Sequence, residues 1–183
     1  MEDIAPTIYL PAVAGNLTSA AALGSLGHPD WGWLFLGAGL FSWVALESLV
    51  IHRLCFSTET PVPQRPLVGI QFAPPVVCAM AWLTLSPGNA DHWLLMLWGY
   101  GLVQLLIGMR LVPWLSVQPF TPAYWAYTFG IAAAAVDSLK LAKMGVQPAQ
   151  IPIFIGANVF NGFITVRTVQ HIITKYFLRH EQG

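Results

Sequence analysis

Residues 66–86, PLVGIQFAPPVVCAMAWLTLS, decide the fold class of this chain. The stretch is long enough to cross the hydrocarbon core of a bilayer, which takes about 20 helical residues. It also carries Gly69, Gln71 and Pro74. Proline leaves backbone groups of a helix without partners, and inside a membrane only protein or enclosed water can supply them. This stretch therefore predicts a transmembrane helix that lies inside a helical bundle rather than against lipid.

Five further apolar stretches follow one another along the chain. The composition is 56% hydrophobic and 9% charged, with a net charge of zero, whereas soluble domains carry about 25% charged residues. No basic run indicates a nucleic-acid partner. We expect an all-α integral membrane protein made of one membrane domain over residues 1–183, with the lipid bilayer as its surroundings. The predicted spans cover residues of about 7–27, 31–54, 66–86, 92–115, 122–143 and 149–177.

The spans alternate in composition. The second and fourth are rich in Trp and Leu, which suits contact with lipid and the aromatic belts. The first, third and fifth carry proline, glycine and small polar residues, and a tight joint follows each of them. We therefore expect three helical hairpins, with the odd helices inside around a polar path and the even helices outside. Close helix packing by small residues is an alternative for each odd helix. The candidate pore-lining residues are Pro11, Gly15, Asn16, Gln71, Pro74 and Gly130.

Basic residues predict the orientation. Arg53, Arg65 and Arg110 fall on the same side of the predicted spans as the cations near the C-terminus, whereas Lys140 and Lys143 fall on the other side. Lys and Arg are enriched in cytoplasmic loops of membrane proteins. We therefore expect a multi-pass protein of the cell inner membrane, the plasma membrane, with a cytoplasmic C-terminus.

Six short sequence motifs, here called motif strings, occur along the chain in this order: residues 9–11 (YLP), 35–39 (FLGAG), 69–74 (GIQFAP), 98–101 (WGYG), 110–114 (RLVPW) and 125–130 (WAYTFG). Together they resemble the tellurite-resistance and C4-dicarboxylate transporter family, which includes plant slow anion channels and a yeast malate permease. The resemblance implies five helical hairpins around a quasi-fivefold axis, with the odd helices lining a pore, and a homotrimer. This chain resembles the C-terminal six of the ten helices, so the resemblance implies a partial bundle that is part of a longer protein.

The resemblance also implies a gate. In that family a phenylalanine on the ninth helix projects into the pore, and Phe129 is the residue at the matching position. Packing between helices is the alternative for any such aromatic residue. A pore lined by small residues without fixed charge holds ions weakly, which suits passive conduction. The expected function is therefore a channel or facilitator for small inorganic or organic anions, with no enzyme activity, cofactor or metal.

Carboxyl groups within the spans cost free energy unless they have partners. Glu47 lies deep in the second span, where hydrogen bonding to a neighbouring helix and proton coupling are both open interpretations. Asp137, Lys140 and Lys143 are three residues apart along the fifth span, which predicts a local ion pair.

Three other functions stay open. A proton-coupled dicarboxylate transporter or a tellurite exporter would use Glu47 as its titrating group. A membrane haem protein or enzyme would use His52 and His171 as iron ligands. A nonfunctional remnant is the third alternative, because the resemblance covers only six helices of ten.

Overall fold

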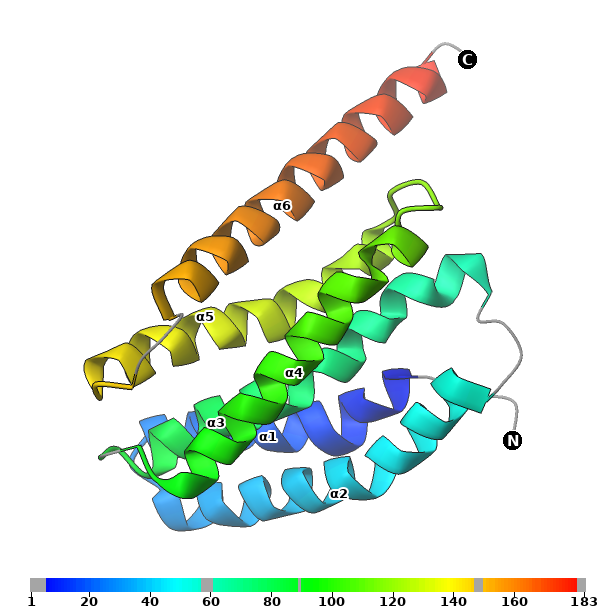
Figure 1. Cartoon of the computed structure of the whole chain (residues 1–183). Helices are drawn as coiled ribbons and strands as arrows, with labels where there is room; N and C mark the ends of the chain where they lie inside the picture. The colour runs from blue at the N-terminus through cyan, green and yellow to red at the C-terminus, as the bar shows by residue number, and fades with distance from the viewer. Residues whose placement is uncertain (1–5, 57–60, 89, 147–149, 181–183) are drawn as a thin grey trace.

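The computed structural model describes residues 6–56, 61–88, 90–146 and 150–180. These residues form helices and no strand, which confirms the all-α prediction. The α-helices are α1 (Gly15–Ser25), α2 (Pro29–Phe56), α3 (Ala73–Leu85), α4 (His92–Leu115), α5 (Thr128–Lys143) and α6 (Gln150–His180) (Figure 1). Short segments of other helix types precede the odd helices: the 3-10 helix η1 (Pro6–Ile8) and the π-helix η2 (Leu10–Ala14), then the 3-10 helices η3 (Val62–Phe72) and η4 (Pro122–Tyr127).

The odd spans share one local design, in which a proline-containing irregular helix continues directly into an α-helix. Pro11 lies in η2, Pro66 in η3 and Pro122 at the start of η4. Pro74 falls in the first turn of α3, where an α-helix leaves backbone N–H groups unpaired and tolerates proline. These prolines therefore mark a change of helix type and not a kink within an α-helix.

Two of the three hairpins turn in the same way. Gly27 follows α1 and Gly145 follows α5, both with positive φ angles of 81° and 78°. After α1 the His28 N–H donates to the Leu23 carbonyl, and after α5 the Val146 N–H donates to the Leu141 carbonyl. This is the Schellman motif, which glycine favours because its φ is positive. The hairpin of α3 and α4 turns differently. There Asp91 caps the N-terminus of α4 by accepting a hydrogen bond from Leu94 N–H at 2.8 Å.

The helices form an inner row and an outer layer, as the alternation in composition predicts. In the inner row, α3 packs between α1 and α5, while α2, α4 and α6 each pack against their hairpin partner (Figure 1). Burial follows this arrangement. In the most apolar stretch of each helix, 72% of the residues are buried for the η3–α3 span but only 22% for α2 and 17% for α4.

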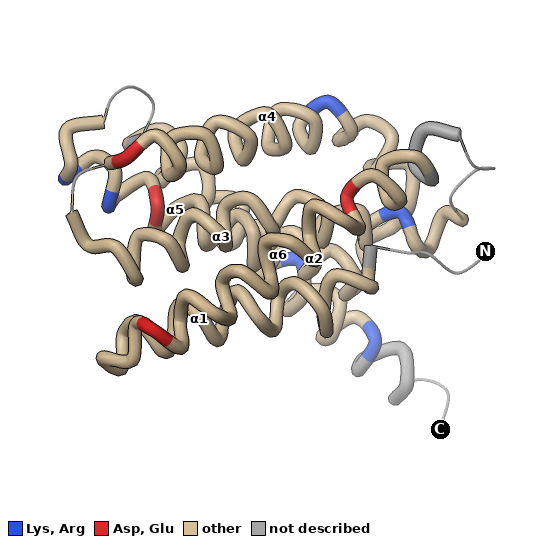
Figure 2. Tube along the Cα trace, turned by 90° about the horizontal axis from the view of Figure 1, so that it is seen from below, with Lys and Arg blue, Asp and Glu red and all other residues tan. Residues whose placement is uncertain are grey.

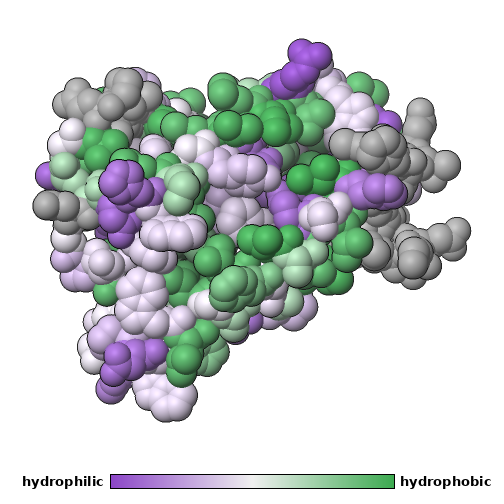
Figure 3. Space-filling model, turned by 60° about the horizontal axis from the view of Figure 1, so that its bottom comes forward, coloured by the Kyte–Doolittle hydropathy of each residue, from purple (hydrophilic) through white to green (hydrophobic). Residues whose placement is uncertain are grey.

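Three of the described helices are long and apolar enough to cross a membrane: Pro29–His52, Val62–Leu85 and His92–Leu115. The other three spans stay predictions. α1 and α5 are short because η2 and η4 supply the first part of their spans, and α6 carries Asn158, Asn161 and several threonines. The surface suits lipid: most charged residues lie toward the two ends of the bundle (Figure 2), and apolar side chains cover much of the face in Figure 3. The protein is therefore a multi-pass membrane protein.

Candidate functional site

Two motif strings meet in a close contact within the inner row. Residues 69–74 and 125–130 lie at the junctions of η3 with α3 and of η4 with α5. A Cβ added to Gly130 would lie 2.9 Å from the Ala73 Cα, and a Cβ added to Gly69 would overlap the Tyr127 ring. Such distances leave no room for a side chain at either glycine. Gly130 is therefore a packing residue at this contact, and it is buried rather than at the border of an open space.

Phe129 lies beside this contact but points elsewhere. Its side chain is 44% exposed, although the adjacent Gly130 is buried against α3. Further exposed residues follow it along α5 at intervals of three and four, so that they share one side of the helix. We call this side the free face of α5. Its members are Phe129, Ala132, Val136, Leu139 and Lys143.

The first inner span also has an exposed side. Pro11 and Gly15 are exposed and lie four residues apart, and Ala22 continues the same side two turns later. Asn16 is half-buried, and its amide Nδ2 donates to the Ala12 carbonyl of its own span at 2.7 Å. The predicted pore-lining residues of this span therefore differ: Pro11 and Gly15 are accessible, whereas Asn16 is half-buried and one of its two amide N–H donors is already used.

In the middle of the row, the two candidate pore-lining residues are buried. Pro74 is buried in the first turn of α3, and Gln71 is 2% exposed at the end of η3. Neither the Nε2 nor the Oε1 atom of Gln71 has a hydrogen-bond partner among the described residues. A buried amide without partners loses the free energy of its hydration. Gln71 is thus the one of the six candidates that keeps unsatisfied donors inside the bundle.

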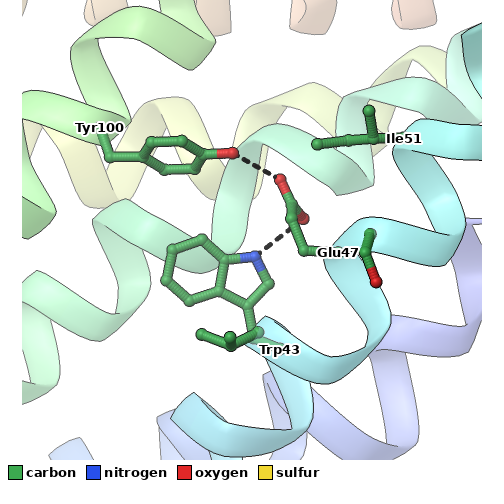
Figure 4. A pocket seen from close by; sticks show the side chains of 6 residues that line it. Trp43, Glu47, Ile51 and Tyr100 are labelled. Carbon is green, nitrogen blue, oxygen red and sulfur yellow. Dashed lines mark hydrogen bonds between the residues drawn. The ribbon is translucent and has the colours of Figure 1, made fainter.

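Glu47 lies at the centre of a hydrogen-bond network that joins three elements (Figure 4). Its Oε2 atom accepts from the Tyr9 hydroxyl at 2.6 Å and from Trp43 Nε1 at 2.9 Å. Its Oε1 atom accepts from the Tyr100 hydroxyl at 2.8 Å and from Gln104 Nε2 at 3.0 Å. Because the donors come from the first span, α2 and α4, the carboxylate connects the inner row to two outer helices.

An open recess of about 410 Å³ borders this network, and all its lining residues belong to α2 and α4. It therefore lies between two outer helices and not between inner ones. Its lining residues are Trp43, Val44, Glu47, Ser48, Ile51 and Tyr100 (Figure 4).

Asp137 differs from its predicted role. It is 0% exposed, and neither carboxylate oxygen has a hydrogen-bond partner in the described part of the chain. Lys140 Nζ instead lies 3.5 Å from the Thr84 hydroxyl of α3. The expected ion pair with Lys140 is therefore wrong, because Asp137 lies on the buried side of α5. The signal was present in the sequence, since Gly130, Ala134, Asp137 and Leu141 recur at helical spacing.

The two histidines considered as haem ligands lie apart. His52 is on α2 and His171 on α6, and these two helices lie at opposite sides of the bundle (Figure 1). The His171 ring packs 6.1 Å from the Phe120 ring. Within the described residues, no group of three or more His, Cys, Asp or Glu side chains could hold a metal ion.

Cationic side chains near one end of the bundle lie over aromatic rings. The Arg65 guanidinium is 4.6 Å from the centre of the Trp114 ring, and that of Arg167 is 5.8 Å from the centre of the Phe120 ring. Such contacts hold a cation at the level where apolar surface meets water. Arg110, near the same end of α4, is exposed.

Comparison with known proteins agrees with this architecture. Residues 1–172 match the model of the SLAC1 family, described as voltage-dependent anion channel. The chain is 36% identical over 176 residues to the tellurite resistance protein TehA homolog of Haemophilus influenzae, covering 95% of this chain and 53% of that protein. It is 25% identical over 176 residues to the S-type anion channel SLAH1 of Arabidopsis thaliana, covering 87% of this chain and 45% of that channel.

A second plant channel, the S-type anion channel SLAH4, is 27% identical over 135 residues, which are 72% of this chain and 36% of that channel. The chain thus spans about half the length of the bacterial relative and less than half of the plant channels. The match over residues 1–172 confirms the resemblance carried by the motif strings, and the chain belongs to the SLAC1 family of voltage-dependent anion channels.

Proposed function

We propose that this chain forms part of a channel or facilitator for small anions, with Phe129 as the side chain that obstructs the path. The observation that carries the proposal is the placement of Phe129 on the free face of α5, 44% exposed, while Gly130 beside it packs against α3. A ring held on a fixed backbone and directed away from the packed side can close a narrow path by its volume and by dewetting.

The chemistry of the accessible faces supports anions over cations. The free face of α5 bears no acidic residue and ends at Lys143, and the exposed side of the first inner span consists of small neutral residues. A lining without fixed charge binds an ion weakly enough to release it, and a cation at one end attracts anions. Family membership supports the same class, because the plant relatives are named anion channels.

The test is anion flux through the complete protein in liposomes, with chloride and nitrate as probe ions. Phe129→Ala is expected to raise the flux. Phe163→Ala is the matched control, because Phe163 is 57% exposed on the outer helix α6 and its removal opens no inner path. Equal flux in the Phe129→Ala and unaltered proteins would reject Phe129 as the gate, and absence of flux in both would count against the channel itself.

A proton-coupled carrier is the second candidate, and the buried carboxyl of Asp137 favours it. Glu47 suits this role less well, because each of its oxygens already accepts two hydrogen bonds. Flux that follows an imposed pH gradient at fixed voltage would support the carrier, whereas flux that ignores the gradient supports a passive channel. The substrates of such a carrier would be dicarboxylates or oxyanions of tellurium.

We further propose that the complete protein is a homotrimer in the cell inner membrane, with the C-terminus of this chain in the cytoplasm. The exposed Arg110 lies near the C-terminal end of α4, and the exposed Arg167 lies over Phe120 of the joint that follows α4, whereas Lys143 is the last residue of α5. Positive charge favours the cytoplasmic side. Labelling of cysteines introduced at positions 110 and 143 by a membrane-impermeant reagent tests the orientation. Native mass spectrometry tests the trimer.

A further inference from the structure

Asp137 has the most unusual surroundings of any carboxyl group in the described chain. Its side chain is 0% exposed, and neither oxygen has a hydrogen-bond partner among the described residues. The neighbouring Ser138 does not help, because its hydroxyl donates to the Ala135 carbonyl of the same helix at 2.7 Å. Buried polar groups in proteins are almost always hydrogen-bonded, so a bare carboxyl inside a membrane bundle calls for a physical explanation.

Few titratable groups lie on the elements that pack against α5. On α3 the only one is Cys78, which is buried and close enough to Asp137 for electrostatic interaction. Residues 150–166 of α6 contain no titratable side chain. Arg65 of η3 and the tyrosines of η4 pack near the opposite end of α5, where η4 joins it. Asp137 lies about 12 Å further along the helix, since it is the eighth residue after Phe129 and each residue adds about 1.5 Å.

Among the described residues, the cation that acts electrostatically on Asp137 is Lys140, one turn along the same helix. Its Nζ atom lies 3.5 Å from the Thr84 hydroxyl of α3, and no ion pair with Asp137 forms in the described chain. An ionised carboxylate in these surroundings would lack both water and a countercharge, and such a charge costs several kcal/mol or more. A neutral carboxyl group avoids that cost.

We propose that Asp137 is a proton-binding site of this protein. The carboxyl group carries a proton while α3 and α5 are packed as seen here. When the proton leaves for water at the Lys140 end of α5, the carboxylate that remains takes the Lys140 ammonium as its countercharge, and Lys140 leaves Thr84. The charge balances, because one carboxyl group becomes one carboxylate and one aqueous proton. Proton binding is thereby linked to the contact between two inner helices.

Glu47 is the alternative proton-binding site, since it is the other carboxyl group well inside a described helix. A proton on either Glu47 oxygen would displace one of the four donors that already point at it. Asp137 has no such donor to displace. The two groups can be separated in an experiment, because one is an aspartate and the other a glutamate.

Infrared spectroscopy of the reconstituted complete protein at neutral pH tests the proposal, because a protonated carboxyl group has a C=O band distinct from that of a carboxylate. Labelling with [4-¹³C]aspartate is expected to shift this band, whereas [5-¹³C]glutamate is expected to leave it in place. Asp137→Asn then assigns the band, which should be lost in this variant and retained in Ser138→Ala, the control at the adjacent buried position.

The labelling arm uses unaltered protein, so it stays decisive if Asp137→Asn does not fold. A band that shifts with labelled glutamate, or a spectrum with no protonated carboxyl band, would overturn the proposal. The measurement requires no transport. A failure here is therefore separate from a failure of the proposed anion flux.

Discussion

Gly130 of α5 meets Ala73 of α3 backbone to backbone, so closely that a Cβ on Gly130 would lie 2.9 Å from the Ala73 Cα. Both residues lie at or within three residues of the point where an irregular segment becomes an α-helix. Phe129, on the accessible side of the same turn, is positioned by this contact. Packing at Gly130 and accessibility at Phe129 are two consequences of one close approach.

Gly130→Ala is therefore expected to destabilise the protein by about 1–3 kcal/mol, the usual cost of forcing an extra carbon into a packed interior. Denaturant unfolding of the purified protein in detergent measures this change. Gly162→Ala on α6 is the matched control, since a Cβ there meets nothing within 4 Å. Equal stability of the two variants would show that α3 and α5 do not approach as closely as described.

Tyr9→Phe removes one donor to the Glu47 carboxylate from a residue that is 1% exposed. Hydrogen bonds to charged groups contribute about 1.5–3 kcal/mol, and a loss of this size is expected in the free energy of unfolding. Tyr100→Phe removes a donor to the other oxygen, but Tyr100 is 37% exposed and water can replace it. The smaller effect is expected there, and the reverse order would contradict the network.

Phe129 provides a graded test of side-chain volume. Phe129→Leu is expected to give a flux between those of the unaltered protein and Phe129→Ala, because obstruction by sterics and dewetting weakens as the side chain shrinks. Stability should change less than the about 3–5 kcal/mol typical for truncation of a buried phenylalanine, since the ring is 44% exposed. Parallel measurement of flux and unfolding separates a gate from a packing residue, for which stability would fall and flux would not rise.

Gln71 should show opposite effects on stability and transport. Its amide is buried with no partner among the described residues, so Gln71→Leu is expected to leave stability unchanged or to raise it by about 1–3 kcal/mol. If the amide serves a passing anion, the same variant should reduce flux. Unfolding and liposome flux measurements together check this prediction, and a marked loss of stability would reveal a hydrogen-bond partner for Gln71.

Much of the fold was predictable from local sequence. Long apolar stretches predict membrane helices because backbone groups in lipid must be satisfied within their own segment. The alternation between Trp- and Leu-rich stretches and those with Pro and Gly predicted which helices are inner, and the burial of the η3–α3 span agrees. Local sequence did not predict that Pro11, Pro66 and Pro122 fall in 3-10 and π segments, because proline excludes one hydrogen bond without specifying which helix type replaces it.

The carboxyl groups show where sequence reasoning stops. Two interpretations of Glu47 were open from its position alone, and its partners Tyr9 and Tyr100 lie 38 and 53 residues away in sequence, beyond the reach of local pattern. The spacing of three predicted an ion pair between Asp137 and Lys140, yet the turn of α5 directs Asp137 into the bundle. The spacing of residues in sequence indicates which side chains can meet along one helix. Burial depends instead on which neighbouring helix packs against each side of that helix.

By itself the sequence determined that this chain is helical, lies in a membrane and belongs to the SLAC1 family, because length, hydropathy and motif strings are local properties. Only the tertiary structure decided which polar groups are satisfied. The four donors at Glu47 and the bare carboxyl of Asp137 arise from contacts between helices, and the geometry of those contacts is set by how closely residues such as Gly130 and Ala73 allow two backbones to approach.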